Sequence, residues 1–129
     1  SNISRFDSEL LAVVTSISNE CEYWIRAHLY DLRSETDNQK LVDEIAKDWT
    51  TSSISSVQMA MCEFAKKLTE NPSKVNKKDI ELLRSYSLSD KDISQIVQII
   101  AYFNYINRVA DGLGLEPEQF IDEKGYKTK

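Results

Sequence analysis

The sequence predicts an all-α protein of about six helices, and three observations support this fold class. The 129 residues include only three Gly and two Pro, which is few for a fold rich in turns. Apolar residues recur at intervals of three and four along most of the chain, as on one face of an α-helix. Residues that often cap helices precede several of these runs. With 41% hydrophobic residues, the chain can form one core but not two, so we predict a single domain over residues 1–129.

The first two helices are predicted from adjacent apolar stripes. The first begins at a cap provided by Asp7 or Ser8 and runs to about Ser18. Its stripe has a 3.6-residue period and comprises Leu10, Val13, Val14 and Ile17. Asn19-Glu20 then provides a break and a new cap, and we expect Cys21 in the first turn of the second helix. The stripe of that helix comprises Trp24, Ile25, His28, Leu29 and Leu32.

Two further helices follow the polar connection at residues 33–38. The third is short and carries Leu41, Val42, Ile45 and Trp49. The fourth follows a serine-rich cap, and its stripe comprises Val57, Met61, Phe64, Ala65 and Leu68. Cys62 lies beside this stripe, where a cysteine usually behaves as a small hydrophobic residue. Asn71-Pro72 ends the helix because proline cannot continue the hydrogen-bond ladder.

The last two helices begin with capping signals at residues 76–79 and 89–92. The sixth helix extends for about 24 residues, roughly 36 Å, to the glycines at positions 112 and 114. It is apolar on most of its circumference, so we expect it to be either the central helix or a helix between subunits. The tail from Glu116 onward has no apolar stripe and is expected to fray.

The charge and cysteine content limit the classes of partner and the compartment. The chain has 16 Lys and Arg against 21 Asp and Glu, a net charge of −5, which argues against nucleic acid as a partner. No apolar run approaches the roughly 18 residues of a membrane-spanning helix, so no membrane association is expected. Two cysteines are too few for a disulfide scaffold, and a cytoplasmic location is the expectation.

Cys21, Trp24 and His28 form a possible site on the second predicted helix. A cysteine at a helix start is near the positive end of the dipole, which lowers the thiol pKa and favours thiolate. The alternative is a small buried residue, and a histidine on an apolar face is more often a satisfied core residue than a catalyst. Asn104 and Asn107 prolong an apolar stripe of the long helix, so they either line a pocket or cap neighbouring helices.

These residues resemble the AhpD-like branch of the carboxymuconolactone decarboxylase family, and most closely its peroxidase-related proteins. The similarity extends from about Ser8 to Glu118. The matching positions share the order of the family pattern and comprise Glu9, Cys21, His28, Phe103-Asn104, Asn107-Arg108 and the segment 111–114. Family members often have further helices before the Glu9 helix, so we expect the chain to represent a shortened or incomplete version of the family fold.

The resemblance implies a proton relay and a thiol peroxidase activity. In the family, the second cysteine of a Cys-x-x-Cys pair attacks peroxide, the first resolves it, and histidine with glutamate activates the attacking thiol. Carried over, Glu9 matches the glutamate, Cys21 the resolving cysteine and His28 the histidine. Trp24 stands where the peroxidatic cysteine should be. No disulfide can form within this motif, so peroxidase activity is expected to be weak or absent.

Three functions remain open on the sequence alone. The first is a thiol peroxidase of antioxidant defence with a dithiol reductant as partner. The second is a non-catalytic descendant that binds a ligand or only oligomerises, and the third is a cofactor-free decarboxylase, for which Arg26 and Arg108 are the candidate substrate-holding cations. The resemblance implies a homo-oligomer of three or six subunits. No metal site and no cofactor are predicted.

Overall fold

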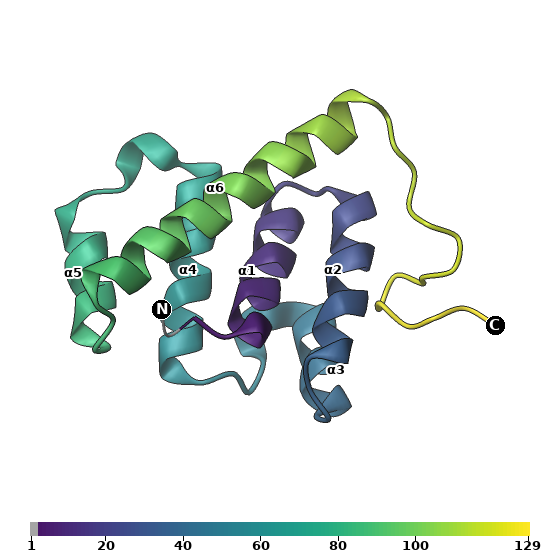
Figure 1. Ribbon diagram of the computed structural model, residues 1–129, viewed down its shortest axis with the longest axis horizontal. Coiled ribbons are helices and arrows are strands. Elements are labelled where there is room, and N and C mark those ends of the chain that lie inside the picture. Colours follow the sequence, from purple (N-terminus) through teal and green to yellow (C-terminus); the bar gives the residue numbers. More distant parts are fainter. Residues whose placement is uncertain (1–2) are drawn as a thin grey trace.

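The structure, a computed structural model, describes residues 3–129, and these residues form six α-helices, which confirms the all-α prediction (Figure 1). The helices and their bounds are α1 (Arg5–Ser18), α2 (Glu22–Ser34), α3 (Gln39–Asp48), α4 (Ser56–Glu70), α5 (Lys77–Ser85) and α6 (Asp90–Gly112). Short 3-10 turns follow α3 and α4 at Trp49–Thr51 and Pro72–Lys74. None of the helices within residues 3–129 has both the length and the apolar character needed to cross a bilayer.

The central helix is α1, which packs against α2, α4 and α6. All of its side chains from Leu10 to Ser16 are buried. The longest helix, α6, has 23 residues and crosses over α4, α1 and α2 on one side of the molecule (Figure 1). The sequence left two positions open for the long helix, the centre of the fold or an interface between subunits. The centre is occupied by α1 and not by α6.

Polar caps determine where most of the helices begin. Ser55, Asn76 and Ser89 each form a complete capping box, as the sequence signals at residues 76–79 and 89–92 predict. The predicted start of α1 was wrong by a few residues: the cap is Ser4, whose Oγ accepts a hydrogen bond from the Asp7 N–H at 3.0 Å. Asp7 instead lies in the first turn, where its negative charge interacts favourably with the positive end of the helix dipole.

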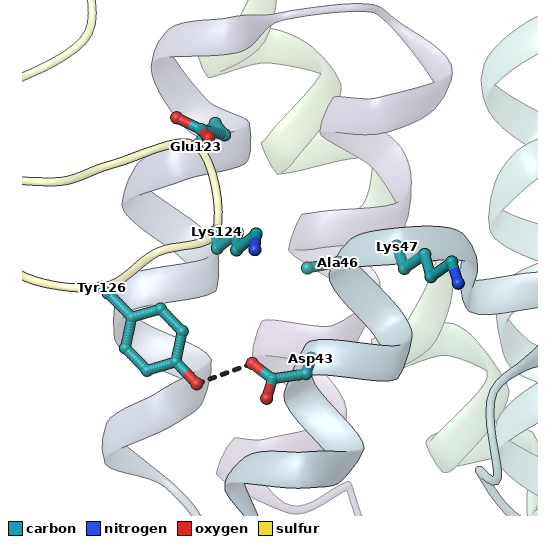
Figure 2. Close-up of a pocket in the computed structure, with 6 residues that line it drawn as sticks. All are labelled: Asp43, Ala46, Lys47, Glu123, Lys124 and Tyr126. Carbon is teal, nitrogen blue, oxygen red and sulfur yellow. Dashed lines mark hydrogen bonds between the residues drawn. The ribbon is translucent and has the colours of Figure 1, made fainter.

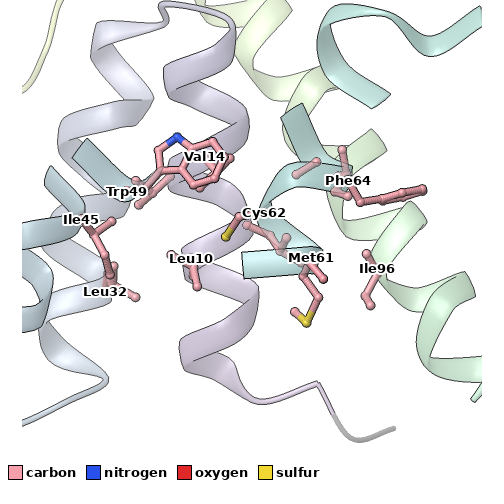
Figure 3. Close-up of a cluster of buried hydrophobic side chains, with 14 of the residues drawn as sticks. Leu10, Val14, Leu32, Ile45, Trp49, Met61, Cys62, Phe64 and Ile96 are labelled. Carbon is pink, nitrogen blue, oxygen red and sulfur yellow. The ribbon is translucent and has the colours of Figure 1, made fainter. Parts of the chain in front are cut away.

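The apolar stripes of α1 to α6 meet in one hydrophobic core (Figure 3). Its buried members share the helical spacing seen in the sequence and include Leu10, Val14, Leu32, Ile45, Trp49, Met61, Cys62, Phe64 and Ile96. Cys62 is fully buried among these residues. Burial raises the pKa of its thiol, so Cys62 is a packing residue at neutral pH.

The segment after α6 is ordered against α2, and the expectation that it frays was wrong. Ile121 is buried and pairs with Lys127 in an isolated antiparallel bridge. The backbone carbonyl of Lys124 accepts hydrogen bonds from Arg33 of α2 at 3.0 and 2.8 Å. Single anchoring contacts hold this tail, and they leave no periodic pattern in the sequence.

An open cavity of about 490 Å³ lies between α3 and the tail (Figure 2). Its lining residues come from these two segments and comprise Asp43, Ala46, Lys47, Glu123, Lys124 and Tyr126. The Tyr126 hydroxyl donates a hydrogen bond to Asp43 at 2.6 Å across it. None of the site residues predicted from the sequence lines this cavity.

Candidate functional site

The antiparallel packing of α1 on α2 brings Glu9 and His28 together. Oε2 of Glu9 lies 3.0 Å from Nδ1 of His28, and His28 is only 4% exposed. Asp31, one turn after His28, places Oδ2 at 3.9 Å from the same Nδ1. A proton on Nδ1 that is donated to Glu9 leaves Nε2 with a free lone pair, as a general base requires.

Aromatic rings surround the rest of the imidazole. The indole of Trp24 stacks on His28 with ring centroids 5.0 Å apart and planes 21° from parallel. Phe103 of α6 meets His28 edge to face at 4.8 Å. The Trp24 Nε1–H donates to the Ile106 carbonyl at 3.1 Å, which ties the indole to α6. Nε2 of His28 is buried without a hydrogen-bond partner among residues 3–129.

Cys21 precedes the first turn of α2 and serves as its N-cap residue, rather than lying within the first turn. Its Sγ lies 3.7 Å from the Asn107 carbonyl oxygen, so the thiol is directed toward α6. Burial raises the pKa of Cys21 to about 11. The Trp24 N–H at the helix start lowers it by a smaller amount, and Asp111 raises it further. The expectation of a lowered pKa was therefore wrong, because burial outweighs the helix dipole.

The thiol and the imidazole do not share one site. Cys21 lies two helical turns before His28, and the side chain of Trp24 packs on the ring of His28. Cys21 and Cys62 are both free cysteines. Glu9, His28 and Trp24 thus form one cluster, whereas Cys21 belongs to the contact between α2 and the end of α6.

Asn104 and Asn107 form a hydrogen-bond network at the end of α1. Both accept hydrogen bonds from the side-chain amide of Asn19, at 2.9 and 3.1 Å. Asn107 donates to Ser16 Oγ at 3.2 Å, and Asn104 donates to Thr69 Oγ1 at 3.0 Å. Asn19 is the C-cap residue of α1, but these hydrogen bonds connect side chains and reach no free backbone group at a helix end. The two amides therefore link α6 to α1 and α4 and do not cap a neighbouring helix.

Two residues that contact His28, Phe103 and Asp31, were not identified as site residues from the sequence. Phe103 contributes a ring contact that depends on how α6 crosses α2. Asp31 lies three residues after His28, and this spacing places both side chains on one helix face. The spacing was a usable signal for Asp31, whereas the signal for Phe103 was its place among the positions that resemble the family.

Two solved structures are similar to this chain over most of its length. An uncharacterized peroxidase-related protein from Silicibacter sp. TM1040 matches 92% of the chain with a TM-score of 0.86 and 30% identity. A second, from Ralstonia eutropha JMP134, is described as an alkylhydroperoxidase AhpD core and an uncharacterized peroxidase-related protein. It matches 97% of the chain with a TM-score of 0.86 and 31% identity. The chain is thus similar in structure and in sequence to AhpD-like, peroxidase-related proteins.

The AhpD-like chain spans 62% and 64% of the lengths of these two proteins. It matches no protein-family model and no curated protein. The resemblance to AhpD-like proteins therefore depends on shared structure together with about one identical residue in three.

Proposed function

We propose that this AhpD-like protein retains the Glu9–His28 pair of a thiol peroxidase but has weak peroxidase activity or none. The observation that carries the proposal is the stacking of Trp24 on His28 at 5.0 Å. By resemblance to the family, position 24 is the position of the attacking thiol. The indole fills the space beside the base that a thiol and its peroxide would use.

The chemistry explains why this substitution matters. A thiolate attacks one peroxide oxygen, the O–O bond breaks, and the products are a sulfenic acid and an alcohol. A second thiol then condenses with the sulfenic acid, releasing water and forming a disulfide, which a dithiol reductant returns to two thiols. Cys21 is poorly suited to the first step because its pKa of about 11 leaves little thiolate at neutral pH.

The test is peroxide consumption with a dithiol reductant by the wild type, Trp24→Cys and Trp24→Ser. Serine matches cysteine in size, so any gain in Trp24→Cys alone reports the thiol and not the space created. We expect turnover only in Trp24→Cys, with a disulfide to Cys21, and loss of that turnover when Cys21→Ser is added. Thermal unfolding checks that each variant is folded, since truncating a buried aromatic can cost about 3–5 kcal/mol.

Two results would contradict the proposal. Robust wild-type turnover that disappears in Cys21→Ser would establish a one-cysteine peroxidase. A folded Trp24→Cys protein without activity would show that Glu9 and His28 no longer form a competent relay. Activity in the Trp24→Cys variant would support descent from an antioxidant enzyme. The proposal includes a cytoplasmic location for the protein.

The non-catalytic alternative has some support, and the decarboxylase has less. Trp24, His28 and Phe103 form an aromatic cluster that could contact a ligand without any reaction. A decarboxylase needs a cation to hold its carboxylated substrate, but Arg26 is paired with Glu22 at 2.8 Å. Binding of an aromatic carboxylate without its turnover would favour the non-catalytic alternative.

We also propose that the protein assembles as a trimer or hexamer through α6. A stripe of large apolar side chains on this helix and its C-cap residue is between 43% and 71% exposed and comprises Tyr102, Tyr105, Val109 and the C-cap Leu113. Their spacing of three, four and four residues places them on one helix face. Such a continuous exposed apolar face is typical of an interface. Light scattering that shows a monomer at micromolar concentration would contradict this proposal.

A further inference from the structure

Three potential metal ligands meet where α1 faces the second half of α2. Glu9, His28 and Asp31 each offer a donor atom, and the three atoms all lie within 4.8 Å of one another. His28 Nδ1 is 3.0 Å from Glu9 Oε2 and 3.9 Å from Asp31 Oδ2. Two ligands one turn apart on one helix, with a carboxylate facing them from a neighbouring helix, is an arrangement used by metal sites in helical bundles.

We propose that Glu9, His28 and Asp31 bind a divalent transition-metal ion, with Zn²⁺ as the best-suited common ion. One imidazole and two carboxylates are donors that suit Zn²⁺ better than Ca²⁺ or Mg²⁺, which prefer oxygen ligands alone. The proposal goes beyond the peroxidase-related function and does not depend on either cysteine.

The two distances from Nδ1 lie on either side of the ligand spacing that zinc requires, and all three donor atoms lie within 4.8 Å of one another. Bonds of about 2.0–2.1 Å in a tetrahedral site place neighbouring ligand atoms roughly 3.3 Å apart. The two measured separations from Nδ1 are 3.0 and 3.9 Å, one on each side of that value. Asp31 has the larger distance to cover, and its side chain is 52% exposed, so a rotamer change can bring it closer. The same exposure gives an ion access and leaves a coordination position for water.

The charges around the cluster also favour a cation. Two carboxylates face one imidazole nitrogen, and Glu35 adds a further negative charge near Asp31. Burial raises the pKa of Asp31, and the charge of Glu9 raises it further. Arg5 offers a positive charge to Glu35 at 3.5 Å, but its own side chain is 88% exposed. A bound cation would offset the repulsion between Glu9 and Asp31 directly.

A metal ion and the proposed relay would use His28 differently. In the relay, Nδ1 carries a proton that is donated to Glu9, and Nε2 faces the substrate side. A metal ion would take the place of that proton on Nδ1. The peroxidase assay of Trp24→Cys with a chelator present therefore reports thiol chemistry alone. Its failure would not affect the metal proposal, and failure to bind metal would not affect the peroxidase proposal.

The test is calorimetric titration of chelator-treated protein with Zn²⁺, together with the visible absorption spectrum of bound Co²⁺. We expect one ion per chain and a Co²⁺ spectrum that Zn²⁺ abolishes by competition. Asp31→Asn should weaken Zn²⁺ binding at least about tenfold, since it removes a ligand rather than an outer contact. Asp31 is half exposed, so this variant is expected to remain folded.

Glu35→Gln is the matched control, because it removes a neighbouring negative charge from the same surface without removing a proposed ligand. We expect its Zn²⁺ affinity to stay within about threefold of wild type, the size of a screened surface effect. Glu9→Gln should behave like Asp31→Asn. Absence of saturable binding, or equal weakening by Asp31→Asn and Glu35→Gln, would overturn the proposal.

Discussion

Arg33 and His28 are both buried polar residues of α2, but their polar atoms have different surroundings. Arg33 donates from Nε and Nη2 to the Lys124 carbonyl, from Nη2 to Asp43 at 2.9 Å and from Nη1 to the Gln39 side chain at 3.1 Å. Its guanidinium also lies 3.6 Å from the centre of the Tyr126 ring. His28 has a hydrogen bond at Nδ1 only, and its Nε2 is without a partner in the described chain.

This difference distinguishes a residue that stabilises the packing, Arg33, from a residue of the candidate functional site, His28. A buried polar group that is fully hydrogen-bonded fixes the position of the elements around it. A buried nitrogen without a partner contributes no such bond, and such groups in folded proteins call for an explanation such as a functional role. Arg33 thus connects α2, α3 and the tail, whereas Nε2 of His28 has no hydrogen-bond partner in the described chain, as the proposed role of a base requires.

The largest expected effect is on the Arg33 side of this comparison. Arg33→Met should lower the free energy of unfolding by about 2–3 kcal/mol, because it removes the hydrogen bonds that a buried charged group donates to the Lys124 carbonyl and to Asp43. Denaturant unfolding measures the loss, and limited proteolysis should show earlier cleavage of the tail. Arg26→Met is the control, since its half-exposed pair with Glu22 should contribute no more than about 0.5 kcal/mol. Equal losses of unfolding free energy in the two variants would show that Arg33 contributes no more to stability than an exposed ion pair does.

The next effect tests how closely the tail packs on α2. Gly125 has a φ of +81°, and a Cβ there would lie 2.5 Å from Leu29 Cβ. Gly125→Ala should therefore cost about 2 kcal/mol and loosen the tail, because strain and collision add. Gly114 also has a positive φ, +64°, but an added Cβ would have nothing within 4 Å. Gly114→Ala should cost only the conformational part, about 1 kcal/mol. Identical unfolding curves for the two variants would contradict the close packing of the tail.

The helices and the contacts of the tail were not equally predictable from the sequence. The helices and the caps at Asn76 and Ser89 follow from local patterns, and the structure contains them. The partner of Arg33 is a backbone carbonyl more than ninety residues away, which side-chain patterns cannot reveal. The tail was expected to fray for the same reason.

The site was predictable only in part. Periodicity placed Trp24 and His28 on one helix face, but the pairing of Glu9 with His28 came from the family resemblance. The pKa of Cys21 was predicted in the wrong direction because a helix start is visible in the sequence, while burial against α6 is not.

A smaller effect is expected on the His28 side. His28→Leu should change the free energy of unfolding by about 1 kcal/mol or less, since it removes one hydrogen bond and Nε2 has none to lose. Glu9 is 24% exposed and can be solvated after the change. Denaturant unfolding with an unchanged slope would confirm that the fold is retained. A loss of unfolding free energy as large as that of Arg33→Met would show that His28 stabilises the packing as Arg33 does.

The smallest expected effect concerns Asp31 and has a defined pH dependence. The pKa of Asp31 is raised by burial first and by the charge of Glu9 second. A carboxyl whose pKa is higher in the folded state favours folding when it is protonated. This contribution is complete below the ordinary pKa of 3.8 and is lost as the pH rises through the raised value. Ionised Asp31 is therefore slightly unfavourable at pH 7.

Asp31→Asn should accordingly be more stable than wild type at pH 7, by a few tenths of a kcal/mol since the side chain is half exposed, and the gain should shrink toward pH 4. Thermal unfolding of both proteins across this range, in the presence of a chelator, measures the difference. Asp79→Asn gives the opposite control: the hydrogen bond from Lys67 lowers the pKa of Asp79, so this variant should lose stability at pH 7 and approach wild type as the pH falls. If Asp31→Asn is instead destabilised at pH 7 in the same way as Asp79→Asn, then Asp31 is paired with a cationic group. The charge of Glu9 then does not destabilise ionised Asp31.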